Sequence, residues 1–98
     1  MVTKAQVRAQ LKKVIDPELS VNIVDLGLVY TISVRDGKVS ILMTLTTPGC
    51  PLGSVFEELV SGAIRKLPGV ADVSVVLTFD PPWTPDLMSE TARAQLGF

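Results

Sequence analysis

Two side chains that often define protein sites are scarce here: the 98 residues include no histidine and one cysteine. Without an imidazole, one chain cannot form a Ser-His-Asp triad, a Cys-His pair or a histidine metal site. A single cysteine cannot close a disulfide within the chain either. Because the sequence also shows no signal-peptide pattern, the unpaired cysteine predicts a reducing, cytoplasmic compartment.

The sequence also lacks an excess of either charge sign and any long apolar run. Nine basic and ten acidic residues give a net charge of −1 without a basic patch, so nucleic-acid binding is not expected. No apolar run approaches the roughly 18 residues of a membrane helix, so no membrane partner is expected. Hydrophobic residues at 47% and charged residues at 19% exclude a disordered chain. The length predicts one domain, residues 1–98.

The first element is expected to be a helix over residues 3–15. Thr3 and Gln6 have the spacing of a capping box, and Pro17 forces the preceding residue out of the helical region, which ends the helix. The apolar stripe of this helix has helical spacing and is expected to pack in the core: Val7, Leu11, Val14 and Ile15.

Two strands, 28–35 and 38–46, are expected to follow as a hairpin, because Asp36-Gly37 is the sequence typical of a type I′ turn. A second helix is predicted from just after Cys50 to Pro68-Gly69. Its apolar positions fill a helical stripe: Leu52, Val55, Phe56, Leu59, Val60, Ala63, Ile64 and Leu67.

A third strand is predicted over residues 70–79, with Val73, Val75, Leu77 and Phe79 alternating with mostly polar residues. A short helix starting at Thr84-Pro85 completes the order α-β-β-α-β-α. This order predicts a two-layer α/β sandwich of the α+β type, with helices on one face of a three-stranded mixed or antiparallel sheet. Strand orders 2-1-3 and 1-2-3 both remain open.

The two faces of this sheet are expected to differ. One face is apolar and should pack against the helices, with Tyr30 as a core residue among Leu28, Ile32, Val34, Val39, Ile41, Met43 and Leu45. The other face should be mostly exposed to solvent, and it carries Thr31, Ser33, Ser40, Thr44 and Thr46. Three residues on this exposed face are apolar: Val29, Leu42 and Val76. They predict a dimer contact or a patch covered by the chain's own ends.

The connection 16–27 is long for a link between two elements, and such links are often functional. It places three carboxylates, Asp16, Glu18 and Asp25, among apolar residues that favour packing. Two interpretations have equal weight. In the first, Asp16 caps a turn and the other two carboxylates are solvated; in the second, all three belong to a site.

The strongest chemical signal is the turn between the second strand and the second helix. Pro51 suits the first helical position, which places Cys50 at the N-cap, beside free backbone N–H groups and the positive end of the helix dipole. This setting favours the thiolate and is expected to lower the pKa of the Cys50 thiol. The remaining residues of the turn are Thr46, Thr47, Pro48 and Gly49.

The last segment contains the only tryptophan, Trp83, directly after Asp80-Pro81-Pro82. Three prolines within residues 81–85 predict a stiff bend. A structural role for Trp83 is favoured over a binding role, in which its ring would form a wall of the site.

Three segments, taken together and in this order, resemble the SufT/PaaD family of small iron–sulfur cluster assembly domains. They are Asp16-Pro17-Glu18-Leu19 through Val24-Asp25-Leu26-Gly27-Leu28-Val29-Tyr30, then Thr46-Thr47-Pro48-Gly49-Cys50-Pro51, then Asp80-Pro81-Pro82-Trp83. The resemblance implies a fold similar to the C-terminal domain of NifU. It also implies that Cys50 is the family's reactive cysteine and that Asp16, Glu18 and Asp25 are its acidic motif. Since no cysteine follows Cys50, the sequence resembles the short SufT-like type and not the PaaD branch, which has a cysteine-rich extension.

The cysteine count limits what this resemblance can mean. Iron–sulfur clusters generally take four cysteine ligands, or cysteine with histidine, so one chain cannot hold a cluster by itself. We therefore expect no tightly bound cofactor. The favoured interpretation is a non-enzymatic assembly factor whose Cys50 contacts iron or a cluster transiently, while a scaffold or client apoprotein supplies the other ligands. A homodimer that brings two Cys50 thiolates together is the other arrangement.

Two other function classes remain open. One is a plain protein-interaction module in which Cys50 is structural, as many free cysteines are. The less favoured one is a cysteine-nucleophile enzyme, which would have the thiol but no histidine as its general base.

Overall fold

The computed structural model describes residues 2–16, 19–46 and 53–97. Their elements follow the predicted order, with a short 3₁₀ helix added before the last helix. In chain order they are α1 (Lys4–Leu11), β1 (Val29–Arg35), β2 (Lys38–Met43), α2 (Gly53–Arg65), β3 (Asp72–Leu77), η1 (Pro85–Leu87) and α3 (Glu90–Leu96). None of the described helices is long and apolar enough to cross a membrane.

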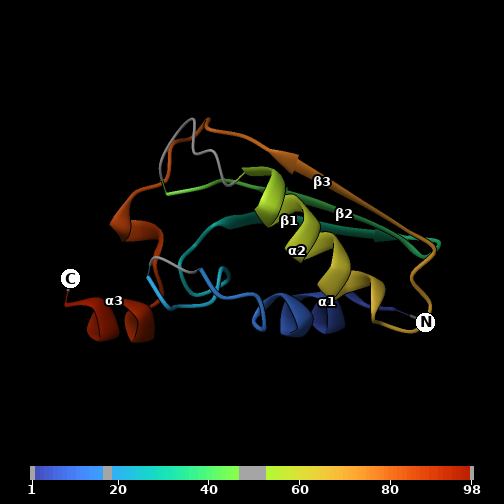
Figure 1. The fold of residues 1–98 in the computed structure, drawn as a ribbon, viewed down its shortest axis with the longest axis horizontal. Coiled ribbons are helices and arrows are strands. Elements are labelled where there is room, and N and C mark those ends of the chain that lie inside the picture. Colours follow the sequence, from blue (N-terminus) through green and yellow to red (C-terminus); the bar gives the residue numbers. More distant parts are fainter. Residues whose placement is uncertain (1, 17–18, 47–52, 98) are drawn as a thin grey trace.

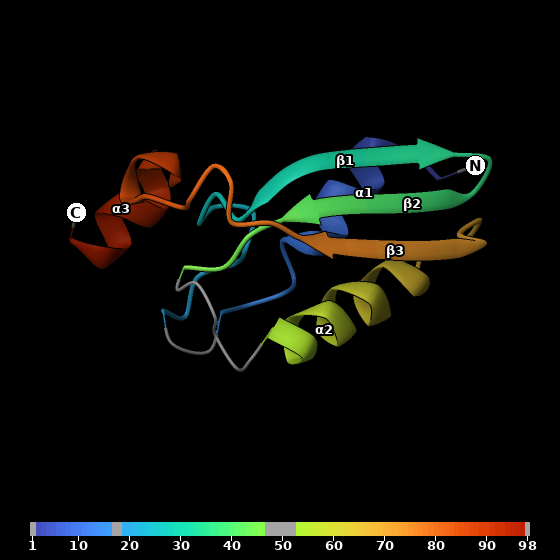
Figure 2. The same cartoon turned by 90° about the horizontal axis from the view of Figure 1, so that it is seen from above.

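The three strands form a mixed sheet in the order β1-β2-β3, which decides between the two predicted orders. β1 is antiparallel to β2, and β2 is parallel to β3, with α2 in the crossover between them. Helices α1 and α2 cover one face of the sheet, whereas α3 lies beyond the end of the strands (Figures 1 and 2). The predicted α+β class with a mixed sheet is confirmed.

Helix α1 begins as the sequence predicts and ends earlier. Thr3 Oγ1 accepts a hydrogen bond from Gln6 N at 3.2 Å, and Thr3 N donates to Gln6 Oε1 at 2.9 Å, which completes the capping box. The helix ends at Leu11 and not at residue 15, because the chain turns into a bridge between Ile15 and Asn22. Ile15, expected in the core, is therefore 49% exposed.

The hairpin turn is as predicted: Asp36 and Gly37 have φ values of 52° and 78°, the two positive values that a type I′ turn requires. The apolar face is buried at Val39, Ile41, Met43 and Leu45. The expectation for Thr44 is wrong, since it is fully buried. Strand β2 has already ended at Met43, and Thr44 N donates to Leu28 O at 2.8 Å, so the alternation of faces no longer applies there.

A register shift in β1 also corrects two expectations. Val29 pairs with Met43 and Thr31 pairs with Leu42, which leaves Tyr30 as an extra residue. As a result Val29 packs against the core. Tyr30, expected in the core, is half-buried, and its hydroxyl donates to Pro81 O at 2.8 Å.

The other two apolar residues of the open face differ in exposure. Val76 is 53% exposed. Leu42 is half-buried and lines a hollow of about 540 Å³, to which Pro81 and Leu87 of the C-terminal segment also contribute. The chain's own end therefore covers part of this face, and a dimer contact there stays a prediction.

Helix α2 buries Phe56, Val60 and Ile64, while Val55 and Leu59 of the predicted stripe are 46% and 47% exposed. The apolar stripe is thus wider than the buried face of the helix. β3 is shorter than predicted, ending at Leu77, and Phe79 is 38% exposed instead of packed.

Candidate functional site

One end of the sheet gathers the described residues of the predicted site. β1 begins at this end, β2 and β3 end there, and α2 starts there, as Figure 2 shows. Thr46 follows β2 and is half-buried, Asp16 and Asp25 precede β1, and Trp83 follows β3. The other predicted site residues lie outside the described residues: Glu18, Thr47, Pro48, Gly49, Cys50 and Pro51.

Asp16 is a buried carboxylate, 4% exposed, at the start of the connection to β1. Its Oδ1 accepts a hydrogen bond from Leu19 N at 3.1 Å. Its backbone carbonyl accepts from Ser20 N at 2.8 Å, and its N–H donates to Val21 O at 2.9 Å. Asp16 therefore organises the turn that carries it, as the first interpretation of this residue predicts.

Asp25 is half-exposed and is held by Asn22 in a reciprocal pair. Asp25 Oδ2 accepts from Asn22 Nδ2 at 2.8 Å, and Asp25 N donates to Asn22 Oδ1 at 2.9 Å. Asn22 was not among the predicted site residues, although the Asn-x-x-Asp spacing resembles a capping box and could have indicated it. This pair fixes the orientation of the Asp25 carboxylate at the end of the sheet.

The described acidic residues do not form a metal centre by themselves. Within 2–16, 19–46 and 53–97, no group of three or more His, Cys, Asp or Glu residues is arranged to hold a metal ion. Asp16 and Asp25 instead hydrogen-bond to different turns. The described part of the site can therefore supply single carboxylate groups, not a ready ligand cage.

The C-terminal segment packs on the connection that carries Asp25. Trp83 Nε1 donates to Leu26 O at 2.6 Å, and Ser89 N donates to Asp25 O at 2.8 Å. Trp83 is half-buried and packs against the core. These contacts give Trp83 a structural role: its indole holds the backbone next to Asp25 in place.

Replacing Trp83 by phenylalanine tests this role. The W83F variant keeps an aromatic ring but loses the hydrogen bond to the Leu26 carbonyl, so we expect it to lower the free energy of unfolding by about 1 kcal/mol. Urea denaturation measures this change. Y30F is the matched control, because it removes the more exposed bond from the Tyr30 hydroxyl to Pro81 O, and it should cost less. Equal losses would contradict a special role for Trp83.

The fold and the candidate site define a class: small α+β domains with a mixed three-stranded sheet and a lone cysteine in the segment before the crossover helix. Residues 4–76 match the sequence profile of a family described as iron–sulfur cluster assembly protein. The chain belongs to this family. The predicted resemblance to SufT-like proteins is thereby confirmed.

Known relatives agree with this assignment. The chain is 43% identical over 97 residues to an Fe–S protein maturation auxiliary factor of Porphyromonas gingivalis, covering 98% of this chain and 92% of the relative. It is 45% identical to the Fe–S protein maturation auxiliary factor SufT of Staphylococcus aureus, covering 86% and 97% of the two chains. It is also 34% identical to an iron–sulfur cluster carrier protein of Synechocystis, matching 98% of this chain but 27% of that longer protein.

A solved structure shares the fold. The crystal structure of a domain of unknown function from Bacillus anthracis superposes with a TM-score of 0.92 at 36% sequence identity. The match covers 97% of this chain and 92% of that one. The arrangement of helices and strands is therefore shared with that domain.

Proposed function

We propose that this protein is an auxiliary factor in iron–sulfur protein maturation that contacts iron or a cluster as cargo, through the single thiolate of Cys50. One observation carries the proposal: a chain of the iron–sulfur cluster assembly family has one cysteine and no histidine. With one cysteine and no histidine, this chain can hold iron or a cluster only if other molecules supply the remaining ligands.

The chemistry is one of ligand exchange, not catalytic turnover. The Cys50 thiol loses its proton when sulfur binds iron, as any cysteine ligand must. A scaffold or client apoprotein supplies the remaining thiolates, and the cargo leaves when those ligands replace Cys50. A second copy of this chain, contributing its own Cys50, is the alternative source of a second thiolate.

The acidic residues have a positioning role in this proposal. Asp16 shapes the connection before β1, and Asp25 presents a half-exposed carboxylate at the end of the sheet where α2 begins. Together with Glu18, they would place negative charge near a cationic metal or near basic groups of a partner. The relatives support this direction, since their names describe Fe–S protein maturation factors and a cluster carrier.

Client reconstitution tests the role of Cys50. An apoenzyme that needs an iron–sulfur cluster is loaded from a scaffold in the presence of wild-type protein or the C50S variant, and its activity is followed over time. We expect C50S to reduce the accelerated loading to near the rate seen without added factor, because a serine hydroxyl is a much poorer iron–sulfur ligand than a cysteine thiolate. Equal acceleration by C50S would refute the proposal.

A relocated cysteine is the matched control. The double variant C50S/S33C keeps one thiol per chain but moves it to an exposed strand position in β1, away from α2. If this variant restores loading, any surface thiol suffices and the position of Cys50 is not functional. The pH dependence of alkylation separates a structural cysteine from a reactive one. A thiol pKa at or above the ordinary value would favour the interaction-module interpretation.

A further inference from the structure

The outer edge of β3 is free within the described part of the chain, since β2 lies on its other side. Thr78 N donates to Met43 O at 2.8 Å, so residue 78 directs its backbone groups toward β2. The backbone N–H and C=O groups of successive residues point to opposite sides of a strand. Those of Val73, Val75 and Leu77 therefore point away from β2, toward the outer edge. Asp72 Oδ1 accepts from Val73 N at 2.9 Å. The N–H groups of Val75 and Leu77 then remain as donors that the sheet does not use.

The two edges of this sheet are built differently. β1 has the register shift at Tyr30 and ends on Arg35, and both an irregularity and a charge discourage pairing with another strand. β3 pairs with β2 in unbroken register, and after Asp72 it contains no charge and no proline. Edge strands without such protection readily accept an added strand. The outer edge of β3 is thus open to strand addition.

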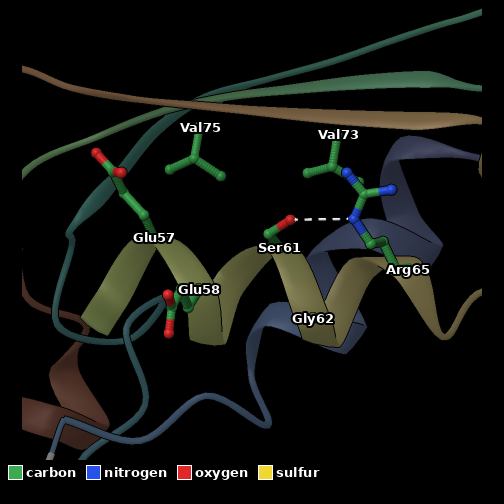
Figure 3. A pocket seen from close by; sticks show the side chains of 7 residues that line it. All are labelled: Glu57, Glu58, Ser61, Gly62, Arg65, Val73 and Val75. Carbon is green, nitrogen blue, oxygen red and sulfur yellow. Dashed lines mark hydrogen bonds between the residues drawn. The ribbon is translucent and has the colours of Figure 1, made fainter. Parts of the chain in front are cut away.

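A groove runs beside this edge. It has a volume of about 450 Å³ and lies between two residues of β3, Val73 and Val75, and five residues of α2: Glu57, Glu58, Ser61, Gly62 and Arg65 (Figure 3). Ser61 is the small side chain that α2 directs toward β3 at the middle of the groove, between Val75 and Val73 (Figure 3). The groove therefore has room for small apolar side chains of an added strand.

The two ends of this groove carry opposite charge. Glu57 lies near Val75, and Arg65 lies near Val73, as Figure 3 shows. Arg65 also lies 3.7 Å from Asp72, but both side chains are more than half exposed, so this pair is weak and can be shared with another carboxylate. A complementary strand has a basic residue at the Glu57 end and an acidic residue at the Arg65 end.

We propose that the outer edge of β3 and the groove beside α2 bind an extended segment of a partner protein as a fourth, antiparallel strand. β3 runs from the Arg65 end to the Glu57 end, because Asp72 at its start pairs with Arg65. The N-terminal end of an antiparallel segment therefore lies beside Glu57 and carries the basic residue. Its C-terminal end lies beside Arg65 and carries the acidic residue. Backbone hydrogen bonds supply affinity, and the groove selects alternate side chains.

The position of α2 argues against a second copy of this chain as the occupant. Helix α2 runs obliquely along the outer side of β3 (Figure 2). Paired strands lie about 4.8 Å apart, whereas packed helices need about 8–10 Å between their axes. Pairing β3 with β3 of another copy would press two α2 helices together. A segment without its own covering helix avoids this clash.

A designed peptide tests the site on the full chain. The probe is Lys-Thr-Val-Thr-Val-Thr-Glu with blocked ends, in which Lys, both Val and Glu face the groove. In an NMR titration we expect saturable shifts at the amides of Val75 and Leu77, and slower hydrogen exchange there. The peptide with its terminal residues exchanged should bind about fivefold or more weakly, because both ion pairs become repulsive. Absence of saturable shifts at these amides would overturn the site, and equal affinities would overturn the direction.

Four variants make the test specific. S61L should fill the groove and abolish peptide binding, whereas S61A leaves the space open and should bind as wild type does. The charge-swapped variant E57K/R65E should prefer the exchanged peptide. Wild-type affinity in S61L would refute the groove. Peptide binding should persist in C50S, so the test of this site is independent of the test of the proposed role of Cys50.

Discussion

Replacing Gly27 by alanine is expected to lower the free energy of unfolding by about 3 kcal/mol or more. Gly27 has a φ of 77°, a conformation that costs a residue with a Cβ about 1–2 kcal/mol. The added Cβ would also lie 2.7 Å from Cβ of Leu87 and closer still to the Leu87 carbonyl group. Relieving that overlap must displace the C-terminal segment, which adds about 1–3 kcal/mol. Urea denaturation of G27A against wild type measures the loss.

Gly97 provides the matched control for this variant. It has nearly the same φ, 80°, but a Cβ there would meet nothing within 4 Å. G97A should therefore show the backbone cost alone, about 1 kcal/mol. The difference between the two losses isolates the contact between Gly27 and Leu87. If both variants lose the same amount of stability, the close approach of Leu87 has no energetic consequence.

Local signals account for the parts of the fold that could be predicted from sequence. The capping box at Thr3 and Gln6 involves residues three apart, and the turn at Asp36-Gly37 needs only two positive φ values. The order of elements follows from the same kind of information, because periodicity and turn residues are read within short windows. For these features the tertiary structure agrees with the local preference.

Three wrong expectations have a common origin in backbone pairing between separate segments of the chain. Ile15 leaves its helix because the chain forms a bridge to Asn22. Tyr30 leaves the core because β1 shifts register against β2. Thr44 is buried because its strand ends one residue earlier and its N–H bonds to Leu28 O. A one-residue change in register moves a side chain to the other face, and the alternation of a single strand does not reveal it.

The residue types of the candidate site could be predicted from the sequence, but the contacts that hold these residues in place could not. The spacing of Cys50 and Pro51 and the run of three carboxylates are visible in the sequence. The residues that hold Asp25 are not, since Ser89 bonds to its carbonyl from the last segment of the chain. Trp83 likewise acts on Leu26 across 57 positions of sequence. These supports depend on how the C-terminal segment packs, which no local pattern encodes.

Met88 is the side chain that anchors this segment in the core. It is 5% exposed, whereas the neighbouring Leu87 is 44% exposed. We expect M88A to lower the free energy of unfolding by about 2–4 kcal/mol, through lost burial and the cavity left behind. L87A is the matched control and should cost less than M88A does, because 44% of Leu87 is already exposed to solvent. Losses of similar size would show that Met88 is no anchor.

The double variant G27A/M88A decides whether the C-terminal segment packs as one unit. G27A pushes on the backbone of Leu87, and M88A removes the adjacent buried side chain, so each weakens the same contact between segment and core. Once one change has detached the segment, the other has less left to remove. The double variant should therefore lose less stability than the two single losses added together, by about 1 kcal/mol or more. Additive losses would mean that the two residues report on independent contacts. In that case displacing Leu87 would leave the bond between Ser89 and Asp25 intact, and the packing of this segment could not tune the candidate site.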